Sequence, residues 1–162
     1  MYLLYLVNFC LSVKGGIHEK ITYEVAGLIK DRQYSHVVEA GGFLFASGMI
    51  PIDIDKGIAI TDNIRQATEM VLNNVKKVLA AVGSNPEKVV RVTVFLRNKG
   101  DLNSMNKAYR IFFSDKSPAR SCVAANGIPS SAPNEVEVIA VKVDQQFVRS
   151  LYRRRTRLPF HV

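Results

Sequence analysis

Two β-forming runs near the end of the chain, separated by a turn-rich loop, constrain the fold most tightly. The first begins at Pro118 and carries Arg120, while the second begins with Glu135 and Glu137 and ends at Val141. Side chains alternate between faces along a strand, so the two glutamates point the same way. If the two strands are neighbours, Arg120 and one glutamate line a single pocket. A guanidinium binds a carboxylate through two parallel hydrogen bonds and a glutamate can move a proton, so the pattern suits a small carboxylate-bearing substrate.

The same residues also have a plainer interpretation. An arginine and a glutamate on adjacent strands commonly form an ordinary ion pair, which contributes little when it is exposed. Spacing alone favours this ion pair over a binding site, so the choice between them depends on the rest of the chain.

The first half of the chain predicts a hairpin followed by a helix. Gly41-Gly42 separates two β-rich runs, which is typical of a hairpin with a two-residue turn. Apolar residues recur every three or four positions over residues 64–82 and predict an amphipathic helix. Thr61 or Asp62 is the expected N-cap, and Gly83 is expected just past the last turn. Residues 17–30 show no clear period.

The second half adds a strand and another helix before the two final strands. The β-branched run at residues 89–96 predicts the strand. Asp101 is expected to cap the helix, whose predicted apolar face is Leu102, Met105, Tyr109, Phe112 and Phe113. The resulting order, β-β-α-β-α-β-β, indicates an α+β domain with both helices on one face of the sheet. If the other face is apolar, self-association into a ring of subunits covers it.

Positive charge is concentrated at the end of the chain. The formal net charge is +8, and residues 143–162 contain five arginines against one aspartate. This tail either contacts anionic surfaces or RNA or stays solvated, and its composition favours a solvated, disordered tail. The remaining residues are only mildly basic, so we do not expect the domain itself to bind nucleic acid.

The start of the chain is apolar but has the features of neither a membrane span nor a working secretion signal. Residues 1–13 are too short to cross a bilayer, no Lys or Arg precedes them, and the residues that follow form a poor cleavage site. We therefore expect an apolar extension (1–16), one folded domain (17–142) and a basic tail (143–162).

Cysteine and histidine usage predicts neither a disulfide framework nor a metal site. The two cysteines and three histidines are scattered without metal-ligand spacing. A reducing compartment, the cytoplasm, is the simplest expectation, and mitochondrial or secreted locations are the alternatives.

Motifs distributed over residues 34–142 occur together in one family. They are Ser-Gly-x-x-Pro at 47–51, Asn-x-x-Tyr-x-x-Phe-Phe at 106–113, Pro-Ala-Arg-Ser-Cys-Val at 118–123 and Glu-Val-Glu-Val-Ile-Ala-Val at 135–141. Their order and spacing resemble those of the reactive intermediate deaminase family, called RidA or YjgF.

The resemblance implies a chorismate-mutase-like fold and a homotrimer with three clefts, each completed by two chains. It implies hydrolysis of 2-aminoacrylate and related enamines or imines to 2-oxo acids and ammonia, with no metal or organic cofactor. It assigns Arg120 to the substrate carboxylate and Glu135 to the attacking water. The other residues that it places at the cleft are Tyr34, Ser47, Asn106 and Cys122, the last as a small packed group rather than a nucleophile.

Several positions depart from the family pattern. Arg32-Gln33 stand where Gly-Pro usually precede the tyrosine, and His36 stands where glutamine is usual. Asn134 replaces an apolar residue before the first glutamate, which predicts a later start of the last strand. Two other functions stay open: binding of small metabolites without turnover, and RNA cleavage or inhibition of translation, which only the arginine-rich tail favours.

Overall fold

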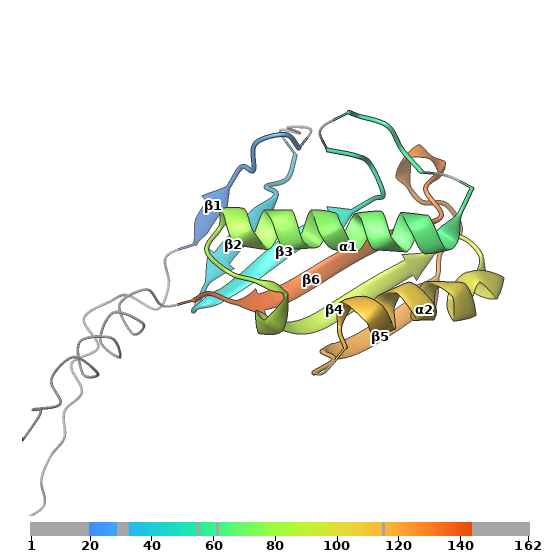
Figure 1. Cartoon of the computed structure of the whole chain (residues 1–162). Coiled ribbons are helices and arrows are strands. Elements are labelled where there is room, and N and C mark those ends of the chain that lie inside the picture. The colour runs from blue at the N-terminus through green and yellow to red at the C-terminus, as the bar shows by residue number, and fades with distance from the viewer. Residues whose placement is uncertain (1–19, 29–32, 55, 61, 115, 144–162) are drawn as a thin grey trace, which may run out of the picture.

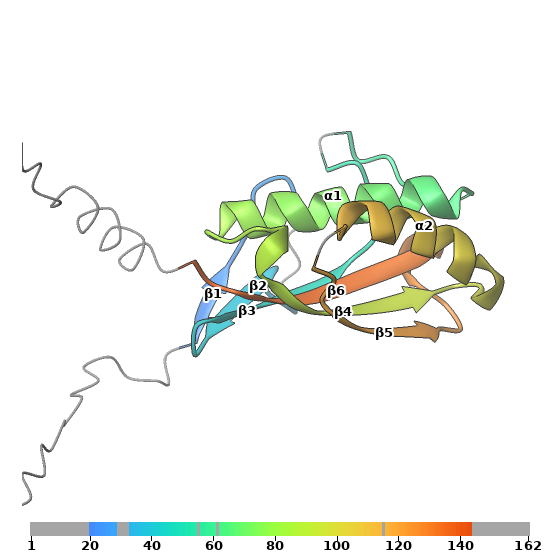
Figure 2. The same cartoon turned by 60° about the horizontal axis from the view of Figure 1, so that its bottom comes forward.

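A six-stranded mixed sheet with two helices on one face forms the protein. The computed structural model describes residues 20–28, 33–54, 56–60, 62–114 and 116–143, so the predicted N-terminal extension and nearly all of the basic tail lie outside the described residues (Figure 1). The strands are β1 Ile21–Tyr23, β2 Val37–Ala40, β3 Phe43–Met49, β4 Val89–Leu96, β5 Ala119–Ala124 and β6 Asn134–Val141. The helices are α1 Ile64–Ala81 and α2 Leu102–Phe112, which lie on the same side of the sheet (Figure 2). The predicted α+β class is confirmed.

The order of the strands in the sheet is β1-β2-β3-β6-β4-β5. Neighbours are antiparallel except for β4 and β5, which are parallel because α2 connects them. The sheet therefore has β4 between β5 and β6, although β5 and β6 follow one another in the chain. Strand β1 is an addition to the predicted order, since residues 17–30 gave no periodic signal.

The predicted hairpin is confirmed, and its turn depends on two glycines. Gly41 and Gly42 have φ angles of 57° and 81°, the left-handed conformation that a tight hairpin turn requires at both central positions. Strand β3 then pairs with β6, which places the hairpin inside the sheet rather than at its edge.

Helix α1 begins one residue later than its predicted caps. The side chain of Asn63 accepts a hydrogen bond from the backbone N–H of Gln66 at 3.1 Å, so the prediction of Thr61 or Asp62 as the N-cap is wrong. The cap has to be the extended residue directly before the first helical one, and Asn63 has φ −123° and ψ 102°. Gly83, with φ 78°, follows the end of the helix as predicted.

The core lies between the helices and one face of the sheet. Its largest fully buried side chains are Leu44, Leu72, Leu79, Leu96, Met105, Val37, Val71, Val75, Val78, Val92, Val94 and Val136. Leu102, predicted for the apolar face of α2, is 40 % exposed, because α2 turns Met105, Ala108 and Tyr109 toward the core instead.

Strand β6 begins at Asn134 itself, so the predicted later start is wrong. Asn134 is fully buried, and its side-chain amide donates a hydrogen bond to the Thr68 hydroxyl at 3.0 Å. A polar partner on α1 thus allows a polar residue at an apolar position of the strand.

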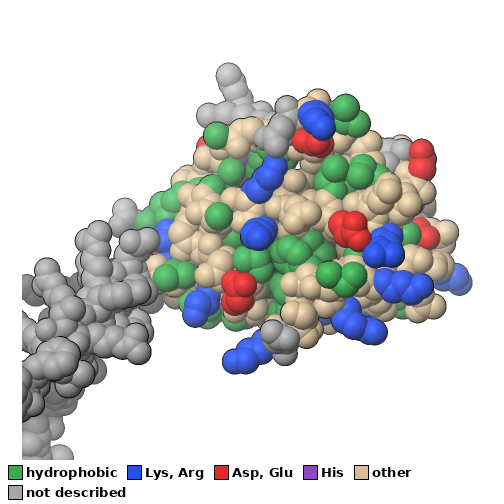
Figure 3. Space-filling view, in the orientation of Figure 1, with side chains coloured by type: hydrophobic (Ala, Val, Ile, Leu, Met, Phe, Trp, Pro, Cys, Tyr) green, Lys and Arg blue, Asp and Glu red, His purple; other side chains and the backbone are tan. Residues whose placement is uncertain are grey.

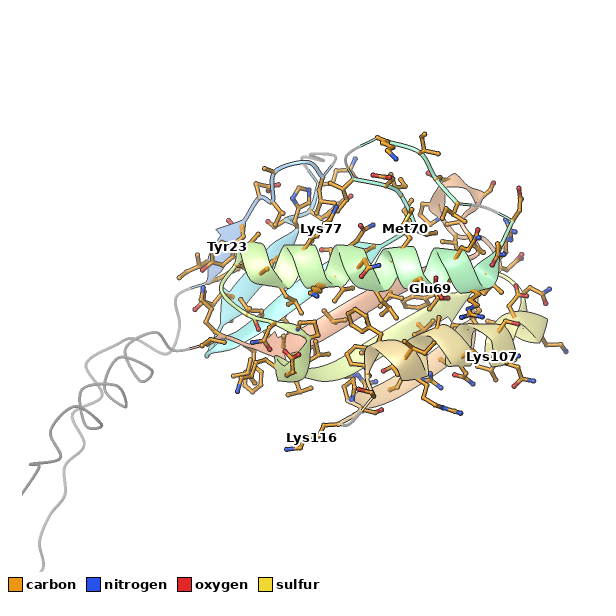
Figure 4. All side chains as sticks on the ribbon, viewed as in Figure 1. Tyr23, Glu69, Met70, Lys77, Lys107 and Lys116 are labelled. Atoms are coloured by element: carbon orange, nitrogen blue, oxygen red, sulfur yellow. The ribbon has the colours of Figure 1, made fainter. Side chains whose placement is uncertain are left out.

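Both faces of the molecule expose charged and apolar side chains. Lys, Arg, Asp and Glu side chains are spread over the helix-covered face (Figure 3), and Lys77 on α1 and Lys107 on α2 are exposed there (Figure 4). The sheet surface opposite the helices, called the open face below, exposes Phe43, Phe45 and Val123. No helix within the described ranges is long and apolar enough to cross a membrane.

Candidate active site

Arg120 projects from edge strand β5 toward α2, where a hydrogen bond and a stacking contact orient its guanidinium. Its Nη1 donates a hydrogen bond to Asn106 Oδ1 at 2.8 Å, and the guanidinium lies 4.6 Å from the centre of the Tyr109 ring. Stacking on an aromatic ring leaves the edge of the guanidinium fork available for a planar anion. Arg120 remains exposed although both partners are fixed on a helix. The site thus presents an oriented cation to solvent.

Two further groups belong to this cluster. Burial raises the pKa of the Tyr109 hydroxyl to about 12, although the charge of Arg120 opposes the shift. Cys122, two residues beyond Arg120 on the same face of β5, packs against the core. Burial raises the pKa of its thiol, again against the charge of Arg120, so the thiol is protonated at neutral pH. A protonated, half-buried thiol is a poor nucleophile.

Glu135 lies on the open face of β6, above Gly48 of the neighbouring strand β3. A methyl group at position 48 would overlap the carboxylate oxygen of Glu135, so only glycine permits this approach. Burial raises the pKa of the Glu135 carboxyl, and the negative charge of Glu137 on the same face raises it further. The predicted common orientation of Glu135 and Glu137 is therefore present. A carboxyl with a raised pKa is suited to proton transfer near neutral pH.

Tyr34 and Ser47 line a cavity of about 200 Å³ at the end of the β2–β3 hairpin away from its turn, and Asn74 and Val78 of α1 also line it. Ser47 Oγ donates to the carbonyl of Ser35 at 2.8 Å, and Tyr34 is 50 % exposed. His36 also lines this cavity and is buried, with its Nδ1 accepting a hydrogen bond from the backbone N–H of Val25 at 2.8 Å. That bond joins the tyrosine loop to the residues that follow β1.

The structure therefore separates the predicted site residues into two groups. The arginine half-site contains Arg120, Asn106 and Cys122. The glutamate half-site contains Glu135 together with Ser47 and Tyr34 of the cavity, and Gly48 both lines that cavity and lies against the carboxylate.

Arg120 and Glu135 do not share a pocket within one chain. Strand β4 lies between their strands, a separation of two strand spacings or about 10 Å. Arg120 is level with Val92 and Glu135 with Phe95, and the two side chains project to opposite faces of the sheet. The expectation that one pocket contains both, which assumed neighbouring strands, is wrong for a single subunit.

Sequence reasoning missed the roles of two residues. Gly48 was part of the Ser-Gly-x-x-Pro motif, but nothing local indicated that a carboxylate lies above it. Tyr109 was assigned to the core, and it does pack there while also supporting the guanidinium. The described residues contain no group of three or more His, Cys, Asp or Glu able to hold a metal ion.

Comparison with known proteins gives one consistent result. The family model described as Endoribonuclease L-PSP matches residues 26–142. The RutC family protein PH0854 of Pyrococcus horikoshii is 38 % identical over 109 residues, which are 67 % of this chain and 86 % of the relative.

Solved structures agree with this match. The crystal structure of YyfA, a Rid-family protein of unknown function from Yersinia pestis, superimposes with a TM-score of 0.72 at 34 % identity, covering 76 % of this chain and 99 % of that one. The structure of E. coli TdcF with bound serine gives a TM-score of 0.66 at 31 % identity, with coverages of 72 % and 91 %.

Proposed function

Since this chain belongs to the endoribonuclease L-PSP family of Rid and YjgF proteins, we propose that it hydrolyses reactive enamines and imines to 2-oxo acids and ammonia. The observation that supports this most is the guanidinium of Arg120, oriented by Asn106 and Tyr109 and exposed to solvent. Such a group suits a small substrate with its own carboxylate. Serine, which is bound in the TdcF structure, is a molecule of that kind.

The proposed active unit is a homotrimer with a site at each subunit boundary. Within one chain Arg120 and Glu135 lie on opposite faces of the sheet with β4 between their strands, too far apart for one small molecule. A neighbouring copy can bring its glutamate half-site to the arginine half-site, and the exposed apolar side chains of the open face favour such self-association.

The reaction with 2-aminoacrylate follows from these roles. Arg120 binds the carboxylate, and a proton added to the methylene carbon converts the enamine into an iminium. Glu135 accepts a proton from water as the water oxygen forms a bond to the iminium carbon. Glu135 returns this proton to the nitrogen of the resulting adduct, and the carbon–nitrogen bond breaks so that ammonia leaves with the electron pair of that bond. The adduct's hydroxyl loses its proton to solvent, which replaces the proton taken up by the methylene carbon, and pyruvate remains. Imines hydrolyse unaided, so positioning and one proton shuttle, worth roughly 10²–10⁴-fold, supply the required acceleration.

The test generates 2-aminoacrylate in situ from serine with a suitable lyase and follows its loss with and without the protein. We expect faster loss with the native chain and a roughly 10–100-fold lower rate with Arg120→Lys, which keeps the charge but loses the fork. Arg110→Lys, an exposed arginine on α2, is the matched control and should leave the rate unchanged.

Two results would contradict this proposal. If Arg120→Lys hydrolyses 2-aminoacrylate at the native rate, Arg120 does not bind the substrate carboxylate through its guanidinium fork. A folded, trimeric protein that does not accelerate the loss would instead favour binding of small metabolites without turnover, and titration with 2-oxo acids would follow.

RNA cleavage, suggested by the family's description, is tested separately by comparing the full chain with one lacking residues 144–162. We also propose a reducing compartment, because Cys122 is a free thiol.

A further inference from the structure

Two opposite charges lie near the middle of the open face. Arg91 on β4 and Glu137 on β6 are both exposed and line a hollow of about 140 Å³ together with Thr93, Phe45 and Ile139. Phe45, at the rim of this hollow, is one of the exposed large apolar residues of the surface. The exposed apolar side chains of the open face mark it as a candidate association surface, so the fate of these two charges on association matters.

Neither charge has an ion-pair partner among the described residues. Arg91 uses its Nη2 to donate to the Ser121 hydroxyl at 3.0 Å on the neighbouring strand β5. Glu137 pairs across the ladder with Thr93, and Arg91 with Ile139, so the two charges are diagonal neighbours about 7–8 Å apart at the backbone. Within one chain Arg91 is hydrogen-bonded to β5, on the side of β4 opposite to the strand of Glu137.

Covering this surface would remove water from both charges. An unpaired charge in a dry interior is strongly unfavourable, whereas a pair with good geometry recovers much of the lost hydration. The occupant of the open face must therefore present an anion to Arg91 and a cation to Glu137. A second copy of this chain presents both on the same kind of surface.

We propose that Arg91 of one copy pairs with Glu137 of the next copy across each contact between open faces. Such a contact joins two different parts of the same surface, so it is head-to-tail and closes into a ring when the rotation permits. The ring of ion pairs selects the register of assembly, since a shifted register would bury both charges unpaired. This inference rests on the homotrimer of the proposed function and names the side chains that specify it.

A charge swap tests the pairing. We expect R91E and E137R each to raise the protein concentration required for assembly by about tenfold or more, because each places like charges together. The double variant R91E/E137R should restore assembly close to the native level. Assembly is measured by light scattering coupled to size-exclusion chromatography, and far-ultraviolet circular dichroism verifies that every variant is folded. R110E, which reverses an exposed charge on the helix face, should change nothing.

Mixing the two single variants separates pairing between chains from pairing within a chain. In a mixed ring the new carboxylate of one variant meets the new guanidinium of the other, so the mixture should assemble better than either variant alone. Pairing within each chain would leave the mixture no better, which would overturn the proposal. Folded single variants that assemble like the native chain would do the same.

The result also separates this inference from the proposed function. If the native chain is monomeric, both the proposed homotrimer and the proposed ring of ion pairs are wrong. A trimeric, active native chain whose charge-swapped variants assemble normally removes only the ring.

Discussion

At the scale of single residues, Gly48 controls the position of the candidate base. Its missing side chain leaves the space that the Glu135 carboxylate occupies, and a methyl group there would overlap a carboxylate oxygen. The side chain of Glu135 can move aside at little cost in folding energy. Adding a methyl group at position 48 therefore leaves the fold intact but displaces the carboxylate.

We therefore expect Gly48→Ala to lower the rate of 2-aminoacrylate hydrolysis by about tenfold or more without changing the fold, because small displacements of catalytic groups are costly. The rate is measured with the coupled assay and the fold by circular dichroism. If the methyl acts through Glu135, then Gly48→Ala adds little to the loss already caused by Glu135→Gln. Additive losses would contradict this explanation.

Glu135 is also expected to reduce stability. Burial and the charge of Glu137 raise the pKa of this carboxyl in the folded state, so its ionised form is disfavoured by folding. That cost is present above the folded pKa and disappears below the ordinary glutamate range, near pH 4. We expect Glu135→Gln to increase the denaturation midpoint at pH 7 and to match the native chain at pH 3.5. Urea titrations at both pH values measure this, and equal midpoints at pH 7 would contradict it.

At the scale of elements, helix α1 depends on one side chain at its start. Asn63 is extended and accepts a hydrogen bond from the backbone of Gln66, so it satisfies one of the N–H groups that the first turn leaves unpaired. No acidic residue in the first turn supplements this cap.

Replacing the cap should therefore destabilise the protein measurably. We expect Asn63→Ala to lower the free energy of unfolding by about 1 kcal/mol. Asn63→Asp should lower it much less, because aspartate accepts the same hydrogen bond. Urea unfolding measures both values. Equal losses for the two variants would show that the hydrogen bond is not the source of the stabilisation.

At the scale of the whole molecule, a polar cluster joins the first strands to the last. Lys142 Nζ lies 2.8 Å from both Glu39 Oε2 and the Tyr23 hydroxyl, and Tyr23 also donates to Glu39. Hydrogen bonds from Lys142 and Tyr23 lower the pKa of the Glu39 carboxyl. Burial works against ionisation of Lys142, but its bonds to Glu39 and Tyr23 outweigh this and raise the pKa of its ammonium.

These shifts predict an acid-sensitive contribution to stability. A carboxyl whose folded pKa is lowered stabilises the fold above its unfolded pKa, and the contribution is lost as the pH falls through the folded pKa. Glu39→Gln should thus be less stable than the native chain at pH 7, with the difference shrinking below about pH 4. Thermal unfolding across this range measures the difference, and a gap independent of pH would contradict the role of the carboxylate.

Much of the architecture was determined by the sequence itself, because the relevant signals are local. The three- and four-residue spacing of apolar side chains predicts α1 without any tertiary information, and Gly41-Gly42 predicts the hairpin because both positions require positive φ. The run at 89–96 corresponds to strand β4 residue for residue. The motif resemblance in turn predicted the family.

Only the tertiary structure decided which strands are neighbours. Alternation along a strand determines which side chains share a face, but pairing between distant segments determines what lies beside that face. Strand β4 therefore separates Arg120 from Glu135, and β1 forms from residues without a periodic pattern because β2 provides its hydrogen-bond partners. The buried Asn134 depends likewise on Thr68, a partner 66 positions away in the chain. Long-range contacts of this kind leave no trace in local spacing, so the division into two half-sites emerged only from the folded chain.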